Sequence, residues 1–157
     1  MDHRGFLKTE RTDFKRELYQ IMANVKTKKA SPSIDAWLKE VKADPKALQD
    51  GMFLVHNGVV RKTPKAKVRQ GIDDGSSVKG MQFAYDAAKV EAAIAETYKQ
   101  EGVFHVRVWL NEGQLQVGDD IMYVLIGGDI RPHVIDALQF LVEKIKTECV
   151  IEIEQKI

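Results

Sequence analysis

Hydrophobic positions recur along much of the chain at helical or strand spacing. After Ser33, apolar side chains repeat at i, i+3, i+4 and i+7 from Ile34 to Val41, which predicts an amphipathic helix. Ser33 can cap its first turn. Asp44 precedes Pro45, and the residue before a proline avoids the helical region. The pattern therefore predicts a short helix that ends before this pair.

Strand patterns follow in five places. Residues 103–110 alternate between apolar and polar side chains, which predicts a half-buried strand. Residues 121–126 form the apolar run IMYVLI, which is typical of a central strand. Residues 51–60, 81–84 and 149–154 are further strand candidates, and Asn57-Gly58 inside the first of them indicates either a bulge or a close approach of another backbone segment.

Two longer helices are predicted at residues 85–100 and 131–147, the second with Pro132 in its first turn. Between the periodic segments, residues 61–80 are expected to be a long polar loop and residues 111–120 a turn region. The order of helices and strands predicts an α+β fold.

The N-terminal part differs from the rest. Residues 1–30 are polar and lysine-rich, with Phe14, Leu18, Ile21 and Met22 spaced as in a short amphipathic helix. We therefore divide the chain into a partly helical extension, residues 1–30, and a domain, residues 31–157.

Composition narrows the class of protein. The 157 residues include 24 Lys+Arg and 23 Asp+Glu, a formal net charge of +1, which argues against a globally basic nucleic-acid binder. The single cysteine, Cys149, cannot form an intrachain disulfide. No apolar run approaches the roughly 18 residues of a membrane span, and the N-terminus has no secretory pattern. We expect a cytoplasmic protein without membrane contact.

Candidate chemistry is concentrated in cations. The four histidines lack zinc-ligand spacing, so no metal site is expected, and Cys149 is a candidate nucleophile only if its environment lowers its pKa. Five cations follow the first predicted strand; they are Arg61, Lys62, Lys65, Lys67 and Arg69. Such a segment is either a solvated loop or an anion site. Arg131 begins a predicted helix, where an anion is favoured, and Lys146 lies in its last turn, where a cation is favoured.

The ordered segments from about Ser33 to Glu152 resemble the large, catalytic subunit of molybdopterin synthase, the MoaE family. The resemblance rests on SIDAWLKEVKADPKALQDGMFLVHNGVVR, on the alanine-rich helix led by Tyr85, on NEGQLQVGDDIMYVLIGGDIR and on FLVEKIKTE. It implies an α/β hammerhead-type fold, in which a mixed sheet has flanking helices.

The resemblance also implies a function in molybdenum cofactor biosynthesis. Such a subunit transfers sulfur to a cyclic pyranopterin monophosphate and thereby forms molybdopterin. The sulfur comes from the thiocarboxylated C-terminal Gly-Gly tail of a small ubiquitin-like subunit. Two large subunits form a homodimer within a heterotetramer, and the protein needs no cofactor of its own.

Site residues follow from the same resemblance. Lys146 matches the catalytic lysine nearest the thiocarboxylate, and Arg61 and Arg131 match arginines that contact the substrate phosphate. Lys62 and Lys144 are further phosphate-binding candidates. We expect Arg61, Arg131 and Lys146 to frame one anion pocket.

The chain departs from the family at several positions. Ile130 replaces a histidine, Ile153 replaces a second lysine, and Leu110-Asn111 replaces a histidine–arginine pair. Either nearby cations such as Lys144 and Lys156 substitute, or the chain has weak or altered activity.

Two other hypotheses remain. The chain could be a non-catalytic relative that keeps the fold and the partner groove. It could also be a nucleic-acid binder that uses its basic loop, although no aromatic residue is interleaved with the loop cations.

Overall fold

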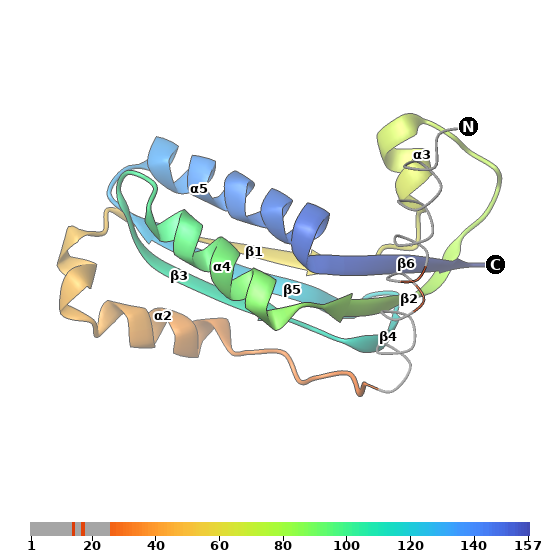
Figure 1. The fold of residues 1–157 in the computed structure, drawn as a ribbon, viewed down its shortest axis with the longest axis horizontal. Helices are drawn as coiled ribbons and strands as arrows, with labels where there is room; N and C mark the ends of the chain where they lie inside the picture. The colour runs from red at the N-terminus through yellow and green to blue at the C-terminus, as the bar shows by residue number, and fades with distance from the viewer. Residues whose placement is uncertain (1–13, 15–16, 18–25) are drawn as a thin grey trace.

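The computed structural model describes residues 14, 17 and 26–157, and it shows two antiparallel sheets with helices packed against them (Figure 1). The elements in chain order are α2 (Ile34–Lys42), the 3₁₀ turn η1 (Pro45–Gln49), β1 (Met52–Val59), α3 (Lys65–Gln70), β2 (Val78–Tyr85), α4 (Ala87–Tyr98), β3 (Val103–Leu110), β4 (Gly113–Gln116), β5 (Asp120–Gly128), α5 (Arg131–Lys144), the π-helical turn η2 (Ile145–Cys149) and β6 (Val150–Lys156).

The strands form two three-stranded sheets, with the orders β1-β5-β3 and β4-β2-β6. The α+β class with flanking helices is confirmed. Every pairing is antiparallel, so the strands form two antiparallel sheets where the resemblance implied a mixed sheet. β5, which contains the apolar run, is the central strand of the first sheet. It pairs with β1 on one side and with β3 on the other, and both neighbours are antiparallel to it. Burial on both faces of the strand accounts for its continuous apolar sequence.

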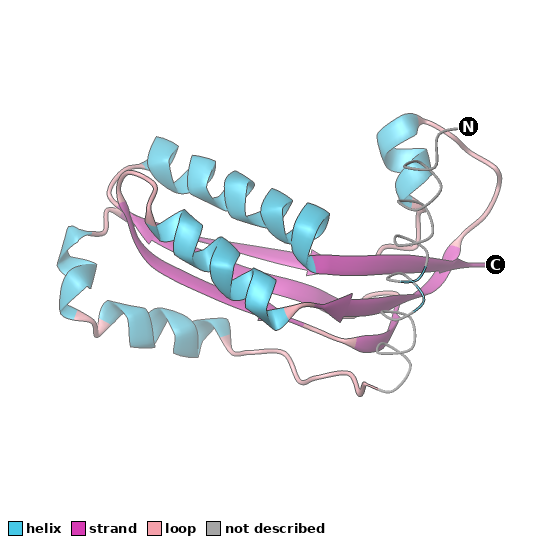
Figure 2. Cartoon of the chain, viewed as in Figure 1, coloured by secondary structure: helices cyan, strands magenta, loops and turns pink. Residues whose placement is uncertain are grey.

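The core lies between the first sheet and the two long helices. α4 packs on β3, and α5 packs on β5 and β1 (Figure 2). Alternate residues of β5 point to this side, and Met122, Val124 and Ile126 are completely buried against Leu141 and its neighbours on α5. These contacts fix the position of α5 on the sheet.

The opposite face of the first sheet carries polar contacts to the N-terminal segment. On this face Arg107 of β3 pairs with Glu40 of α2. Leu125 of β5 lies opposite Arg107 in the ladder and is completely buried. α2 therefore belongs to the layer that covers this second face.

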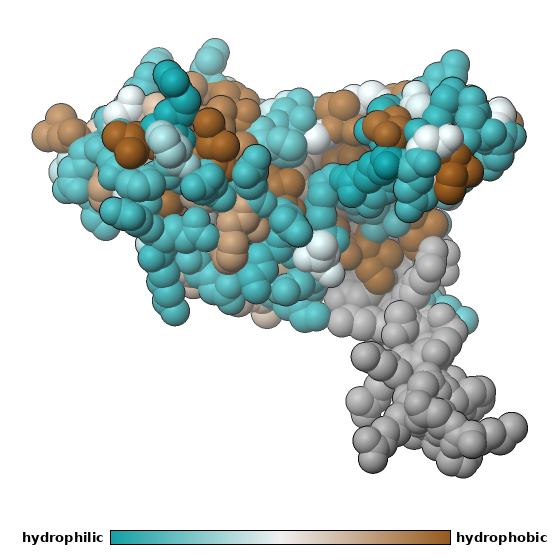
Figure 3. All heavy atoms as spheres, turned by 90° about the horizontal axis from the view of Figure 1, so that it is seen from above, coloured by the Kyte–Doolittle hydropathy of each residue, from teal (hydrophilic) through white to brown (hydrophobic). Residues whose placement is uncertain are grey.

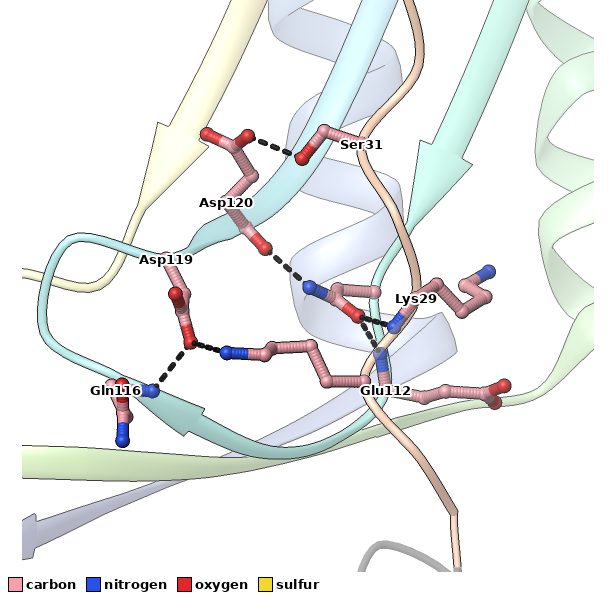
Figure 4. A network of polar contacts seen from close by, with 8 residues as sticks. Lys29, Ser31, Glu112, Gln116, Asp119 and Asp120 are labelled. Atoms are coloured by element: carbon pink, nitrogen blue, oxygen red, sulfur yellow. Dashed lines mark hydrogen bonds and ion pairs between the residues drawn. The ribbon is translucent and has the colours of Figure 1, made fainter.

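Residues 26–31 bind across the turn between β3 and β5 (Figure 4). The Lys29 backbone nitrogen donates to Asn111 Oδ1 at 2.8 Å, and the Asn111 amide donates to the Asp120 carbonyl at 2.8 Å. Lys28 Nζ lies 3.0 Å from Asp119 Oδ2. Asn111 is almost completely buried, and these hydrogen bonds give it a structural role.

Several predicted elements are confirmed. Ser33 caps α2, since its hydroxyl oxygen accepts the Ala36 backbone N–H at 3.2 Å, and α2 ends before Asp44. The strand at residues 103–110 has the predicted bounds, and the β1–β5 register shifts between Gly58 and Val59 as expected for a bulge. The helix predicted around residues 14–22 lies outside the described residues, apart from position 14 and position 17.

Three elements differ from the prediction. The polar segment 61–80 contains the helix α3, which buries none of its residues and therefore has no apolar stripe to reveal it. β4 lies in the predicted turn region, and its only apolar residue is the completely buried Leu115. The last helix leaves α-helical geometry after Lys144 and ends in η2, where Ile145 and Cys149 remain buried.

The surface in Figure 3 carries hydrophobic patches separated by hydrophilic side chains. Among the described residues, no helix has both the length and the apolar character needed to cross a bilayer.

We expect Leu141→Ala to lower the free energy of unfolding by about 2–5 kcal/mol, because it opens a cavity in the completely buried contact between α5 and β5. Ile135→Ala on the same helix is the matched control, since Ile135 is 37% exposed and its truncation should therefore cost clearly less than that of the completely buried Leu141. Urea unfolding measures both, and equal losses for the two variants would contradict this packing.

Candidate functional site

Arg61 and Lys146, which are 85 positions apart in the sequence, line one cavity of about 340 Å³. Arg61 follows the end of β1, and Lys146 lies in η2, directly after α5. Because α5 runs along the sheet toward β6, its last turn ends beside the segment that leaves β1 (Figure 1). The fold itself brings these two side chains together.

Three further cations line the same cavity: Lys65 and Arg69 from α3, and Lys156 from β6. The Lys65 backbone N–H donates to the Glu154 carboxylate, at 3.2 and 3.1 Å from its two oxygens. This contact joins the start of α3 to β6. The segment predicted to be a loop is therefore a helix that carries two of its cations into the cavity.

Two carboxylates, Glu152 and Glu154, also line the cavity, so cations outnumber carboxylates five to two. Glu152 is 14% exposed, and its two oxygens lie 3.9 Å from Lys146 Nζ and 4.0 Å from Lys65 Nζ. Arg61 Nε donates to the Thr63 carbonyl at 3.0 Å, which orients its guanidinium group. The excess positive charge makes this cavity suitable for an anion.

The other predicted cations lie elsewhere. Arg131 begins α5 and Lys146 follows its end, so the two positions are separated by about 20 Å at 1.5 Å per residue. Lys144 Nζ lies 3.2 Å from Glu148 and 3.3 Å from Glu96, and these carboxylates raise the pKa of Lys144. Lys62 is exposed and does not line the cavity. The cavity that Arg61 and Lys146 line within one chain therefore does not include the other three predicted cations, Arg131, Lys144 and Lys62.

Ile130 and Ile153, which the resemblance places at a family histidine and a family lysine, have different surroundings. Ile130 directly precedes α5 and is 52% exposed, at the far end from Lys146. Ile153 on β6 lines the cationic cavity. A longer cationic side chain at position 153 would therefore enter the same cavity as Lys146.

A second hollow of about 560 Å³ adjoins the first and shares Lys146 and Arg69 with it. Its remaining lining residues are His56, Leu138, Gln139, Val142, Glu143 and Thr147. Burial and the charge of Lys146 lower the pKa of His56. Sequence reasoning missed His56 because it stands inside an apolar strand pattern without a chemical motif.

Cys149 is not an activated nucleophile in this structure. Its side chain is 2% exposed, and burial raises the pKa of its thiol, with a smaller contribution from Glu148. Among the described residues, no group of three or more histidine, cysteine, aspartate and glutamate side chains is arranged to hold a metal ion.

The sequence matches the MoaE protein family over residues 27–148. The chain belongs to this family. The resemblance seen in the sequence is confirmed, and with it the family's role in molybdenum cofactor biosynthesis. A comparison with curated proteins finds no match.

Solved structures confirm the MoaE fold. Molybdopterin synthase from Staphylococcus aureus is 18% identical with a TM-score of 0.61, and the match covers 80% of this chain and 86% of that one. The MoaE protein from Burkholderia ambifaria is 17% identical with a TM-score of 0.60, over 82% and 84%. A complex of subunits 1 and 2 of molybdopterin-converting factor from Helicobacter pylori is 17% identical with a TM-score of 0.55, over 81% and 84%.

We expect inorganic phosphate to bind in the cationic cavity and Arg61→Ala to weaken this binding about tenfold or more, because a hydrogen bond to a charged group contributes about 1.5–3 kcal/mol. Isothermal titration at low ionic strength measures the affinity. Lys99→Ala is the matched control, since Lys99 is an exposed cation just beyond α4 and does not line the cavity. Equal affinities for both variants would place the anion elsewhere.

Proposed function

We propose that this chain is the large, catalytic subunit of a molybdopterin synthase, which transfers sulfur from a thiocarboxylated small subunit to a cyclic pterin phosphate. The observation that carries the proposal is the shared cavity of Arg61 and Lys146. These residues match the family's phosphate-contacting arginine and catalytic lysine, and they meet in a cavity with an excess of cations.

The proposed roles follow from charge. Arg61 holds the substrate phosphate, and Lys65 and Arg69 of α3 add positive charge to the same cavity. Lys146 stabilises the negative charge that develops on the acyl oxygen as sulfur leaves the acyl carbon. Lys62 lies next to Arg61 in sequence and contributes to the attraction of the anion from outside the cavity. Lys144 orders the end of α5 through its two carboxylate partners.

The partner is a small ubiquitin-like protein with a C-terminal Gly-Gly. The hollow that holds Leu138 and Val142 leads to Lys146, and a chain end without side chains can pass along such a hollow. The solved complex of two molybdopterin-converting factor subunits, which shares this fold, supports the choice of partner.

We further propose that Arg131 completes the site of a second copy of the chain in a homodimer within a heterotetramer. Arg131 lies about 20 Å along α5 from Lys146, so both can contact one substrate only when they come from different chains.

We expect Lys146→Ala to lower the rate of sulfur transfer about 100-fold or more, because one lost contact to a developing oxyanion typically costs that much. The assay follows conversion of the cyclic pterin phosphate by the complex with the thiocarboxylated small subunit. Lys39→Ala on α2 is the control, since Lys39 is exposed and does not line either hollow.

The wild-type protein should itself transfer sulfur slowly, because Ile153 stands where the resemblance places a second lysine. Ile153→Lys should raise the rate, because position 153 lines the cavity. If neither wild type nor Ile153→Lys converts the precursor, the chain is a non-catalytic relative.

A mixture of two inactive variants tests the shared site. When Arg131→Ala and Lys146→Ala chains are co-expressed, heterodimers contain one site with both native residues, so activity should recover toward half that of wild type per heterodimer. Each variant alone should stay inactive. If Arg131 acted within its own chain, every site would carry a defect, and the mixture would show no recovery.

A further inference from the structure

His56 stands apart from the other histidines of the described residues. His105 lies 2.6 Å from an Asp50 oxygen, and His133 Nδ1 lies 2.7 Å from Asp129 Oδ1. Within residues 26–157, His56 has no hydrogen bond or ion pair, although it is half-buried. Its ring is therefore free to exchange a proton with a bound molecule.

The fold places this ring beside Lys146. β1 is an edge strand of its sheet, and His56 pairs with Val124 of β5. Val124 belongs to the core under α5, so His56 faces the same helix. His56 and Lys146 line the same hollow, which adjoins the cationic cavity.

The surroundings of His56 favour its neutral imidazole. Burial and the Lys146 ammonium group both lower its pKa. The other charged side chains that line its hollow are Glu143 from α5 and Arg69 from α3. Histidine is the side chain whose ordinary pKa lies between about 5 and 8, so His56 is the member of this group suited to accept a proton at neutral pH.

The proposed reaction contains a step that needs such a base. When the thiocarboxylate sulfur bonds to a carbon of the pterin precursor, a C–O bond at that carbon breaks and the oxygen substituent leaves. The precursor is then linked to the acyl carbon of the small subunit as a thioester. Water must then attack the acyl carbon. The new C–O bond forms, the C–S bond breaks, the small subunit leaves as a carboxylate and the pterin keeps a thiol. The step consumes one water and needs no oxidant or reductant.

We propose that His56 is the catalytic base of this hydrolysis: it takes a proton from the attacking water and returns a proton to the departing sulfur. This inference rests on the proposed function. Glu152 is less suited to the task because Lys146 and Lys65 flank its carboxylate. His56 acts after sulfur has been transferred, so its loss should separate transfer from release.

The test uses His56→Gln in the complex with the thiocarboxylated small subunit and the pterin phosphate. We expect multiple turnover to fall about 10²–10⁴-fold, as for the loss of a general base, while the first sulfur transfer continues. Intact-mass spectrometry should then show small subunit that remains covalently bound to the pterin. His133→Gln is the matched control, since His133 lines neither hollow.

Two further measurements exclude a structural effect. The wild-type rate should decline at acid pH with a midpoint below about 6.5, because protonated His56 cannot accept a proton, and this decline should be absent in His56→Gln. His56→Ala should recover activity when imidazole is added. Unchanged turnover in His56→Gln, or slow turnover without accumulated adduct, would overturn the proposal for His56 while active wild type upholds the proposed function. Inactive wild type would overturn both.

Discussion

The burial of one side of α5 against β5 is the constraint on which the site depends. Val134, Ala137, Leu141 and Ile145 are completely buried along this contact, and their spacing fixes both the rotation and the axial position of the helix. Lys146 directly follows the last of these anchors. The position of Lys146 beside the end of β1 is thus set by the packing of apolar side chains, not by polar contacts within the site.

The turn η2 adds a second constraint. Ile145 and Cys149 are both buried in it, and Val150 immediately begins β6, which pairs with β2 through Tyr85. Lys146 is therefore held between a packed helix and a paired strand, with little freedom of its backbone. π-Helical turns are frequent at functional sites, and here the turn joins the lysine to the strand that carries Glu152 and Ile153.

Sequence reasoning reaches the elements whose apolar residues form a clear pattern. Residues 103–110 were predicted as a strand with the correct bounds, although the burial of their side chains does not alternate strictly. The helix α3 escaped because it has no buried side to produce a pattern, and β4 because a single buried leucine does not make an alternation. In the site, Arg61 and Lys146 were predicted from resemblance. His56 was not predicted, because the sequence of β1 does not show that its side chain lies beside the end of α5 and Lys146.

The excess of positive charge is the feature that suits the cavity to an anion. Five cations share it with two carboxylates, and repulsion among the cations would be reduced if an anion were bound. Attraction of a phosphate depends on the sum of nearby charges, so cations from α3 can replace one lost from β6 at position 153. Proton transfer, in contrast, needs one particular group within hydrogen-bonding distance of the proton, so several more distant groups cannot replace it. If the family histidine and lysine are absent here, as the resemblance implies, dispersed charge can still bind a phosphate. The proposed hydrolysis, in contrast, needs one specific proton acceptor, and we propose His56 for it because it lines the same hollow as Lys146.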